Sequence, residues 1–354
     1  MCNLAGYTGS KRAAPILIEM LKREQYFDGG VCTGIATLDH GKIYTTKVVG
    51  NVDELLRTTD ALNFPGTVGI AHSRPGGTLA SQAHPFLDNN ENLALCLNGT
   101  LRDVGTEAFY LKSQEIMQGF LDRGFNLRSQ IPENGKHKKL SNGMAYHDTE
   151  PYAMMVGDLC DQGENLFAAL AKAIGTLPGD IVTLAIHKSQ PDAVAIGRIT
   201  RPMEVAVGDG ESYVATSAIA FPEDIQYRAM LSTPEAAVSV IRPGTFSITE
   251  YPVEGCRVQR ITADIYAKGY ARLEHLLLNA EHPLTIYDMP FFDEWKDLWN
   301  EPYVECEYRT EIGLLKPYAA LMYQILYAFY KEGRLHQTMW DHNGKPLIGF
   351  TLDK

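Results

Sequence analysis

The sequence predicts an α+β fold in which helices lie outside two paired groups of strands. Two observations support this class. Some segments carry apolar residues at helical spacing, while others alternate with period two between turn residues. The strand-like segments fall into two groups with helices between and after them, and a sheet buries an apolar face against another layer. The 354 residues suit one large domain, or one large and one small domain.

In the first half of the chain, strands and helices are interspersed. The expected strands are residues 31–38 and 43–49, joined by a turn at Asp39-His40-Gly41, and then 68–71 and 93–97. The expected helices are residues 52–62, 107–121, 152–159 and 166–174, the last closed by Gly175. The polar stretch 128–142 is expected to be an inserted surface loop.

The spacing of apolar residues changes twice in the later part of the chain. Six strands are expected at residues 181–186, 193–199, 203–207, 212–216, 238–241 and 245–251. Helices are then expected at 265–278 and 315–330, and a hairpin at 335–340 and 347–352 around an Asn-Gly turn. We therefore predict a large domain at residues 2–255 and a small, mainly helical C-terminal domain at 256–354 that ends in a β-hairpin.

Composition excludes several classes of protein. Apolar residues make up 45% of the chain, charged residues 21%, and the net charge is −11, without a basic patch. Nucleic acid and anionic membranes are therefore not expected partners. Apolar runs fall short of the ~18 residues of a membrane span, and Lys11, Arg12 and Glu19 interrupt any apolar signal peptide core, so we expect a cytoplasmic protein. The six cysteines lack metal-ligand spacing, and neither a metal nor another cofactor is expected.

Cys2 is the first residue whose position carries chemistry. Because cysteine is small, we expect the preceding Met1 to be removed, which leaves a thiol and a free α-amine on one residue. An α-amine has a pKa of about 7.7–8.0, so near neutral pH it can accept the proton of the thiol. Cys2 would then be a nucleophile that carries its own base. Taken alone, a second-position cysteine is commonly without function.

Five short motifs follow one another in order. They are Cys2-Asn3-Leu4-Ala5-Gly6-Tyr7, Gly69-Ile70-Ala71-His72-Ser73-Arg74, Ala83-His84-Pro85-Phe86, Leu95-Cys96-Leu97-Asn98-Gly99 and His147-Asp148-Thr149-Glu150. They resemble the Cys-Gly-Ile-x-Gly-Tyr, Gly-x-Ala-His-Thr-Arg, Asn-Ala-His-Pro, Asn-Gly and Ser-Asp-Thr-Glu segments of class II glutamine amidotransferases. By motif, the closest match is the glutaminase domain of glucosamine-6-phosphate synthase. The resemblance covers roughly residues 2–250.

The resemblance implies a four-layer αββα sandwich of the N-terminal-nucleophile hydrolase type and a role for each site residue. Cys2 would attack the side-chain amide of glutamine, and the Asn98 side chain and Gly99 N–H would hold the oxyanion. Arg74 would bind the α-carboxylate, since a guanidinium fork matches a carboxylate. Asp148 would bind the α-ammonium. The same residues also have purely structural alternatives: an ion pair for Arg74, a hairpin turn at Asn98-Gly99, and helix capping by Asp148.

The sequence also departs from that pattern. After Arg74 the family usually carries Trp-Ala-Thr-His-Gly, but this chain has Pro75-Gly76-Gly77-Thr78-Leu79, so the covering loop is altered. Thr78 is expected to supply a hydroxyl to the carboxylate, one place later than the family's threonine. No sugar-phosphate loop of the synthase's isomerase half follows Tyr251. An acceptor-site partner chain and a homo-oligomer are therefore expected, with the aromatic segment 256–354 serving either as a docking surface or simply as a packed core.

Two other functions remain open. The chain could be a related N-terminal-cysteine amidase that acts on another amide; Arg74 and Asp148 argue against this, because together they match the two charges of an amino acid. It could instead be a degenerate protein that binds glutamine or a partner without catalysis. The altered loop after Arg74 motivates that alternative, whereas Cys2, Asn98, Gly99 and Asp148 argue against it.

Overall fold

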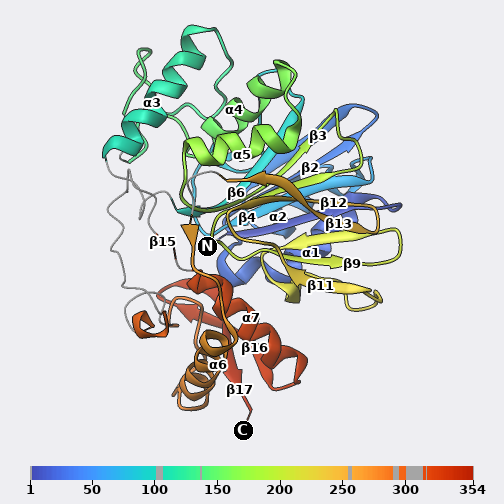
Figure 1. The fold of residues 1–354 in the computed structure, drawn as a ribbon, viewed down its shortest axis with the longest axis vertical. Coiled ribbons are helices and arrows are strands. Elements are labelled where there is room, and N and C mark those ends of the chain that lie inside the picture. The colour runs from blue at the N-terminus through green and yellow to red at the C-terminus, as the bar shows by residue number, and fades with distance from the viewer. Residues whose placement is uncertain are drawn as a thin grey trace.

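Two stacked antiparallel sheets form the centre of the computed structural model, which describes residues 2–100, 107–135, 138–253, 257–289, 295–299, 314–315 and 317–353 (Figure 1). The first sheet has the order β11-β9-β10-β1-β4-β2-β3. Its strands are β1 (Asn3–Thr8), β2 (Cys32–Asp39), β3 (Lys42–Val49), β4 (Val68–Arg74), β9 (Glu204–Val207), β10 (Ser212–Ala215) and β11 (Ala229–Ser232). β1 is therefore the central strand of this sheet.

The second sheet has the order β13-β12-β8-β7-β6-β5. Its strands are β5 (Phe86–Leu87), β6 (Leu93–Thr100), β7 (Asp180–His187), β8 (Val194–Arg198), β12 (Ala237–Arg242) and β13 (Thr245–Pro252). The facing surfaces of the two sheets bury a shared apolar core that includes Leu4, Ile70, Cys96 and Leu184. This core holds the two sheets together, and the candidate site lies at one end of their strands.

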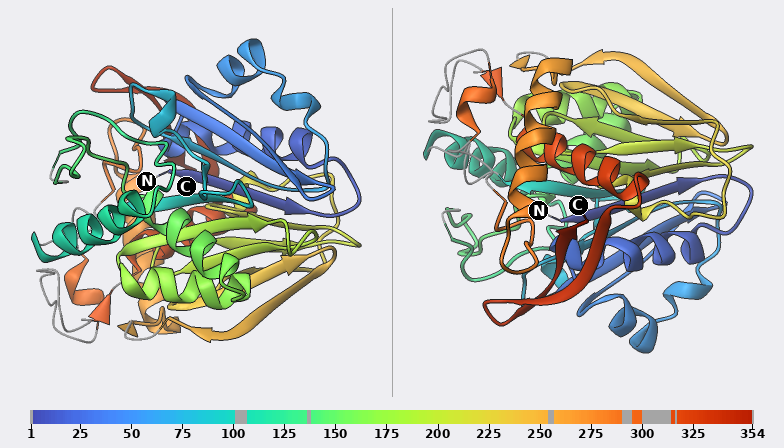
Figure 2. Two further views of the ribbon diagram at one scale, coloured as in Figure 1. Left: turned by 90° about the horizontal axis from the view of Figure 1, so that it is seen from above. Right: turned by 90° about the horizontal axis from the view of Figure 1, so that it is seen from below.

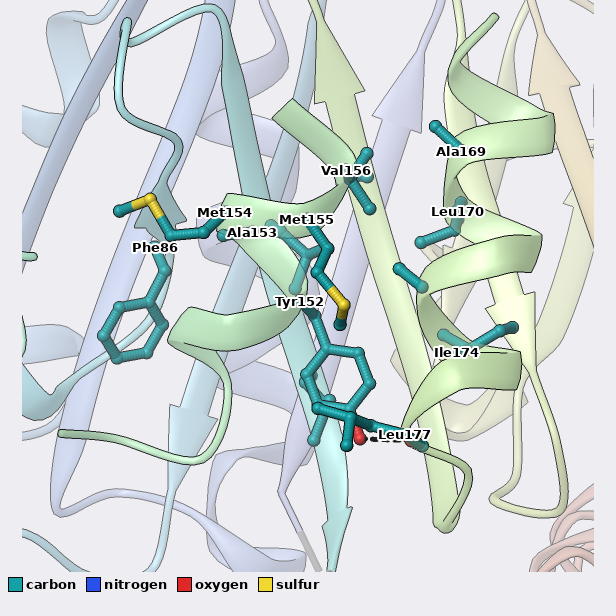
Figure 3. Close-up of a cluster of buried hydrophobic side chains, with 14 of the residues drawn as sticks. Phe86, Tyr152, Ala153, Met154, Met155, Val156, Ala169, Leu170, Ile174 and Leu177 are labelled. Atoms are coloured by element: carbon teal, nitrogen blue, oxygen red, sulfur yellow. Dashed lines mark hydrogen bonds between the residues drawn. The ribbon is translucent and has the colours of Figure 1, made fainter. Parts of the chain in front are cut away.

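Helices cover the outer face of each sheet (Figure 2). On the first sheet lie α1 (Ala13–Asp28), α2 (Val52–Thr58) and η1 (Ala61–Asn63). On the second lie α4 (Glu150–Asp161) and α5 (Leu166–Thr176), with α3 (Glu107–Asp122) against α4. Figure 3 shows the apolar side chains of α4 and α5 that pack towards the second sheet, where the hydroxyl of Tyr152 donates to the Leu177 carbonyl. The layers are thus helix, sheet, sheet and helix.

A smaller C-terminal unit packs against α1. Its elements are β14 (Arg257–Val258), α6 (Ala263–Leu278), η4 (Lys296–Leu298), β15 (Leu314–Leu315), α7 (Tyr318–Lys331), β16 (Leu335–His342) and β17 (Lys345–Leu352). Its apolar core includes Phe27 of α1 and Ile219 of η3 (Ala218–Ala220). The hydroxyl of Tyr287 also donates to Asp28. Figure 1 shows this unit at the end of the sandwich where the chain starts.

The predicted fold class is confirmed, and several boundaries are corrected. α5 continues through Gly175 to Thr176, and the expected helix at 52–62 is α2 followed by the separate turn η1. The stretch 128–142 is not simply a surface loop, because Ser129 is fully buried. The boundary predicted between residues 255 and 256 lies at 254–256, outside the described residues, and stays a prediction. In the described part of the chain, no helix is long and apolar enough to cross a membrane.

Candidate active site

Cys2 lies immediately before the central strand β1. The β1–β4 pairing puts Asn3 opposite Ser73, so the neighbouring residues Cys2 and Arg74 lie at the same end of these two strands. Thr216, just beyond β10, fixes the start of β1 from the other side. Its hydroxyl accepts from Leu4 N–H at 2.9 Å and lies 3.3 Å from the Cys2 carbonyl oxygen. The nucleophile predicted from the sequence is therefore held on both sides.

Asn98 reaches Cys2 from the second sheet. Its side-chain oxygen Oδ1 accepts a hydrogen bond from the Cys2 backbone nitrogen at 2.8 Å, across 96 residues of sequence. The side chain is fully buried, and its amide nitrogen Nδ2 has no hydrogen-bond partner among the described residues. A buried donor without a partner costs stability. Nδ2 is therefore placed to donate to an oxygen of a molecule that Cys2 attacks.

Gly99 follows Asn98 in a conformation that other residues avoid. Its φ is +153°, and a Cβ placed there would lie 2.3 Å from the Asp180 carbonyl oxygen. Only glycine fits this position, because any side chain would collide with backbone. In this structure Asn98 and Gly99 pair with β7 as part of strand β6, so they do not form the hairpin turn that the dipeptide also permits.

Arg74 ends β4 beside Cys2 and is half-buried. Its Nη1 donates to the Gln82 carbonyl oxygen at 2.9 Å and lies 2.7 Å from Nε2 of His147. These described partners are a carbonyl and an imidazole rather than a carboxylate, unlike the structural ion pair considered above. The positive charge of Arg74 therefore remains available for an anion near Cys2.

Three histidines form a layer behind Arg74. The rings of His72 and His84 stack with centroids 3.9 Å apart, and His147 lies edge-on to His84 and stacks on Phe86. Burial holds the pKa of His72 and His84 well below the usual value, so both rings are neutral. His84 Nδ1 accepts from Leu97 N–H, which places its proton on Nε2, facing the Thr149 hydroxyl. Sequence reasoning did not assign a role to His147.

Asp148 and Thr78 occupy different environments. Asp148 is half-buried in the turn that leads into α4, directly after His147. The N-cap position of α4 is Thr149, so the helix-capping reading does not require Asp148. Thr78 is exposed in the loop after β4. Neither placement tests the predicted roles in substrate binding, which stay predictions.

The surroundings of Cys2 shift the pKa of its thiol in opposite directions. Burial raises the pKa of the Cys2 thiol, while the positive charges of Arg74 and Arg201 lower it. A thiol that stays protonated needs a base at the moment of attack. The described residues contain no cluster of three or more His, Cys, Asp or Glu side chains arranged to hold a metal ion.

Comparison with known proteins gives the same family resemblance. No protein-family model matches the chain. Its sequence is similar to glutamine–fructose-6-phosphate aminotransferase (isomerizing) of Pyrococcus horikoshii, with 26% identity over 298 residues, which is 81% of this chain and 45% of that protein. The protein of the same name from Methanothermobacter thermautotrophicus is 28% identical over 297 residues, 81% of this chain and 44% of that one. The chain thus spans less than half the length of these relatives.

Solved structures support the fold. The glutamine phosphoribosylpyrophosphate amidotransferase from B. subtilis matches with a TM-score of 0.55 and 19% identity, over 75% of this chain and 52% of that one. A structure described as the allosteric regulatory enzyme of purine biosynthesis matches with a TM-score of 0.57 and 15% identity, over 97% and 67%. The predicted resemblance to class II glutamine amidotransferases and the predicted αββα fold are confirmed.

Proposed function

We propose that this chain hydrolyses the side-chain amide of glutamine at Cys2 and releases glutamate and ammonia. One observation carries the proposal: the buried Asn98 side chain binds the Cys2 nitrogen through Oδ1, while its Nδ2 donor has no partner among the described residues. That arrangement supports a nucleophile and an oxyanion donor on either side of one reacting carbonyl. The similarity to proteins named glutamine–fructose-6-phosphate aminotransferase supports glutamine as the amide.

The first half of the reaction forms a thioester. The α-amine of Cys2, free once the preceding residue is removed, takes the thiol proton as sulfur attacks the amide carbonyl carbon. Negative charge then develops on the carbonyl oxygen, where Asn98 Nδ2 and the Gly99 N–H donate hydrogen bonds. The tetrahedral intermediate collapses, the C–N bond breaks, and ammonia leaves with the proton held by the α-amine.

The second half releases glutamate. Water attacks the γ-glutamyl thioester, the α-amine takes a proton from that water, and the C–S bond breaks to restore the thiol. The Oδ1 of Asn98 supports this cycle, because its 2.8 Å contact with the Cys2 nitrogen orients the base throughout. The same residue thus positions the base with one atom and stabilises the oxyanion with the other.

Recognition of the amino acid falls to two charged residues. Arg74 is proposed to bind the α-carboxylate and Asp148 the α-ammonium, and each offers a charge opposite to its ligand. The half-buried setting of both residues supports this assignment. The alternative of an amidase acting on another amide predicts no dependence on these two charges.

The ammonia is proposed to pass to an acceptor bound by a partner chain, with residues 256–354 as a docking or dimerising unit. In the described part of that unit, Tyr323 and Phe329 fill its core, whereas Tyr287 is 47% exposed. The hydroxyl of Tyr287 donates to Asp28 at the end of α1, which ties this unit to the large domain. The mass of the chain in solution, and its rate with and without cell extract, test for a partner.

A glutaminase assay tests the proposed function directly. The purified chain is expected to release glutamate from glutamine, and a diazo-ketone analogue of glutamine is expected to label Cys2. A chain that binds glutamine without hydrolysis, even with cell extract, would favour the degenerate alternative. Hydrolysis of simple amides but not of glutamine would favour the amidase.

A further inference from the structure

The backbone of Cys2 is held at two points by different sheets. Its nitrogen donates to Asn98 Oδ1 at 2.8 Å, and its carbonyl oxygen accepts from the Thr216 hydroxyl at 3.3 Å. Asn98 belongs to β6 of the second sheet, whereas Thr216 directly follows β10 of the first sheet. The first contact orients the base of the proposed reaction, and the second needs an explanation of its own.

The N–H and the hydroxyl of Thr216 both bond to the start of β1. The Thr216 backbone N–H donates to the Leu4 carbonyl oxygen at 3.1 Å, and the Leu4 N–H donates to the Thr216 hydroxyl at 2.9 Å. A backbone N–H only donates, so the hydroxyl oxygen accepts there. Its own proton is left to donate to the Cys2 carbonyl oxygen, which only accepts. The directions of both side-chain hydrogen bonds of Thr216 are therefore fixed.

Thr216 is itself firmly placed. It is buried, and the next residue, Ser217, donates its backbone N–H to the Glu24 carboxyl group of α1 at 3.3 Å. On the other side, the Asn3 side chain donates to the Glu24 carbonyl oxygen. The segment after β10 and the start of β1 are thus tied to the same residue of α1. Thr216 and Cys2 are therefore held in a fixed relation to each other.

Removal of Met1 makes the orientation of Cys2 depend on these contacts. A residue inside a chain is restrained by a rigid peptide plane on each side, but a terminal residue has only the plane that follows it. Rotation about its Cα–C bond then moves the α-amine and the thiol relative to that plane. The Asn98 contact restrains the amine, and the Thr216 contact restrains the carbonyl group that defines the plane.

We propose that Thr216 is a positioning residue for the reaction at Cys2. Its hydroxyl, through the Cys2 carbonyl oxygen, holds the α-amine in the orientation in which it takes the thiol proton. This inference rests on the proposed function. Because Thr216 acts through the backbone of Cys2 and not on the substrate, loss of its hydroxyl should lower kcat and leave KM nearly unchanged. A misplacement of about 1 Å can cost about 100-fold in rate.

Variants that change little besides the hydroxyl test this role. Thr216→Val replaces the hydroxyl with a methyl group of similar size, and Thr216→Ser keeps it. We expect Thr216→Val to lower kcat for glutamine about 10- to 100-fold, with KM within about threefold of the unaltered chain. Thr216→Ser should keep kcat within about threefold, because the hydrogen bond is retained. Thermal unfolding checks the fold, and Thr216→Ala, which inserts no methyl group in place of the hydroxyl, carries the same expectation as the valine variant.

Thr8→Val is the matched control. Thr8 lies at the opposite end of β1, is buried, and donates its hydroxyl to the Asp192 carbonyl oxygen at 2.8 Å. The variant therefore removes a buried hydrogen bond to a carbonyl from the same strand, but at the end remote from Cys2. We expect kcat to stay within about threefold of the unaltered chain, since the lost bond is worth stability and not orientation of the base.

Alkylation of Cys2 by iodoacetamide gives a readout that does not depend on glutamine. The C–S bond forms, the C–I bond breaks with loss of iodide, and near neutral pH the thiol proton passes to the α-amine. Thr216→Val should therefore label Cys2 about 10-fold more slowly near neutral pH. At high pH hydroxide removes the thiol proton, so the difference between the two chains should narrow. A loss of packing alone would slow labelling at every pH.

Each outcome supports or overturns the role of Thr216. Unchanged kcat and an unchanged labelling rate in Thr216→Val refute it, as does a labelling difference that stays constant with pH. If Thr216→Ser is as slow as the valine variant, the hydroxyl is not responsible and the role is again refuted. If the unaltered chain releases no glutamate, the proposed function fails, and slower labelling of Cys2 in Thr216→Val near neutral pH would still support positioning of the amine.

Discussion

Replacing Asn98 separates its two proposed tasks. Asn98→Asp keeps an oxygen to accept from the Cys2 nitrogen, as Oδ1 does at 2.8 Å, but replaces the Nδ2 donor with a second oxygen. Asn98→Ala removes both atoms. Both variants therefore lose the oxyanion donor, but only Asn98→Asp keeps the acceptor that orients the Cys2 nitrogen.

The expected loss in kcat follows from the burial of the Asn98 Nδ2 donor. Removing one oxyanion-hole donor costs about 2.7–4 kcal/mol, or 10²–10³ in kcat. Nδ2 is buried, where water cannot readily replace it, so the full cost is expected. In the aspartate variant, any negative charge would also oppose the developing oxyanion. Both variants should lose at least about 100-fold in kcat. KM should change little, because the proposed ligands of the two charges, Arg74 and Asp148, are unaltered.

Steady-state release of glutamate by the purified chain measures both constants. Thermal unfolding checks that each variant folds. Asn63→Asp adds the same negative charge at an exposed position and serves as the control, with kcat expected to stay near that of the unaltered chain. If Asn98→Asp kept more than about a tenth of kcat, far more than loss of an oxyanion donor allows, the oxyanion assignment would be wrong.

Four further predictions follow from the same geometry. Cys2→Ala should abolish glutamate release and labelling by the diazo-ketone; labelling at another cysteine would redirect the assignment. Arg74→Ala and Asp148→Ala should each weaken glutamine binding by about 2–5 kcal/mol, read as a higher KM, and an unchanged KM in both would favour the amidase. Gly99→Ala should lower stability by about 2–6 kcal/mol in denaturant unfolding, since φ is +153° and a Cβ meets a carbonyl oxygen at 2.3 Å. Burial raises the pKa of Glu24 well above its unfolded value, so its ionisation destabilises the fold as pH rises; Glu24→Gln should raise Tm near pH 8 and lose that advantage near pH 4, and a pH-independent difference would contradict this.

The local sequence pattern was sufficient to predict most strands and the later helices, but it did not predict α1. That helix buries Glu24, Gln25 and Asp28 on the face that carries Leu17 and Leu21. Polar residues on the buried face interrupt the apolar periodicity that marks a helix. Tertiary contacts explain them instead: the Glu24 carboxylate accepts from the Ser217 backbone N–H, and Asp28 accepts from Tyr287. Neither partner can be inferred from spacing along the helix.

The sequence indicated which residues to examine as a candidate site, but it did not indicate how they are arranged in space. Ordered motifs pointed to Cys2, Arg74 and Asn98, and the structure brings these residues together at one end of the strands. The bond between Cys2 and Asn98 joins residues 96 positions apart on different sheets, so it depends on how the sheets stack. His147 was quoted only as a member of a motif, because its contacts with Arg74, His84 and Phe86 come from elements distant in the sequence.

The altered loop after β4 passes close to Arg74 without contributing a side chain to it. Gly77 has a φ of +125°, and a Cβ there would lie 2.8 Å from the sulfur of Cys32 and 3.8 Å from Arg74 Nε. The loop therefore passes Arg74 with a residue that has no side chain, while Thr78 next to it is exposed. The contacts of Arg74 come from other elements instead: the Gln82 carbonyl accepts from Nη1 at 2.9 Å, and His147 Nε2, in the turn before α4, lies 2.7 Å from it. The altered loop therefore changes what covers Arg74 without changing what holds its side chain beside Cys2.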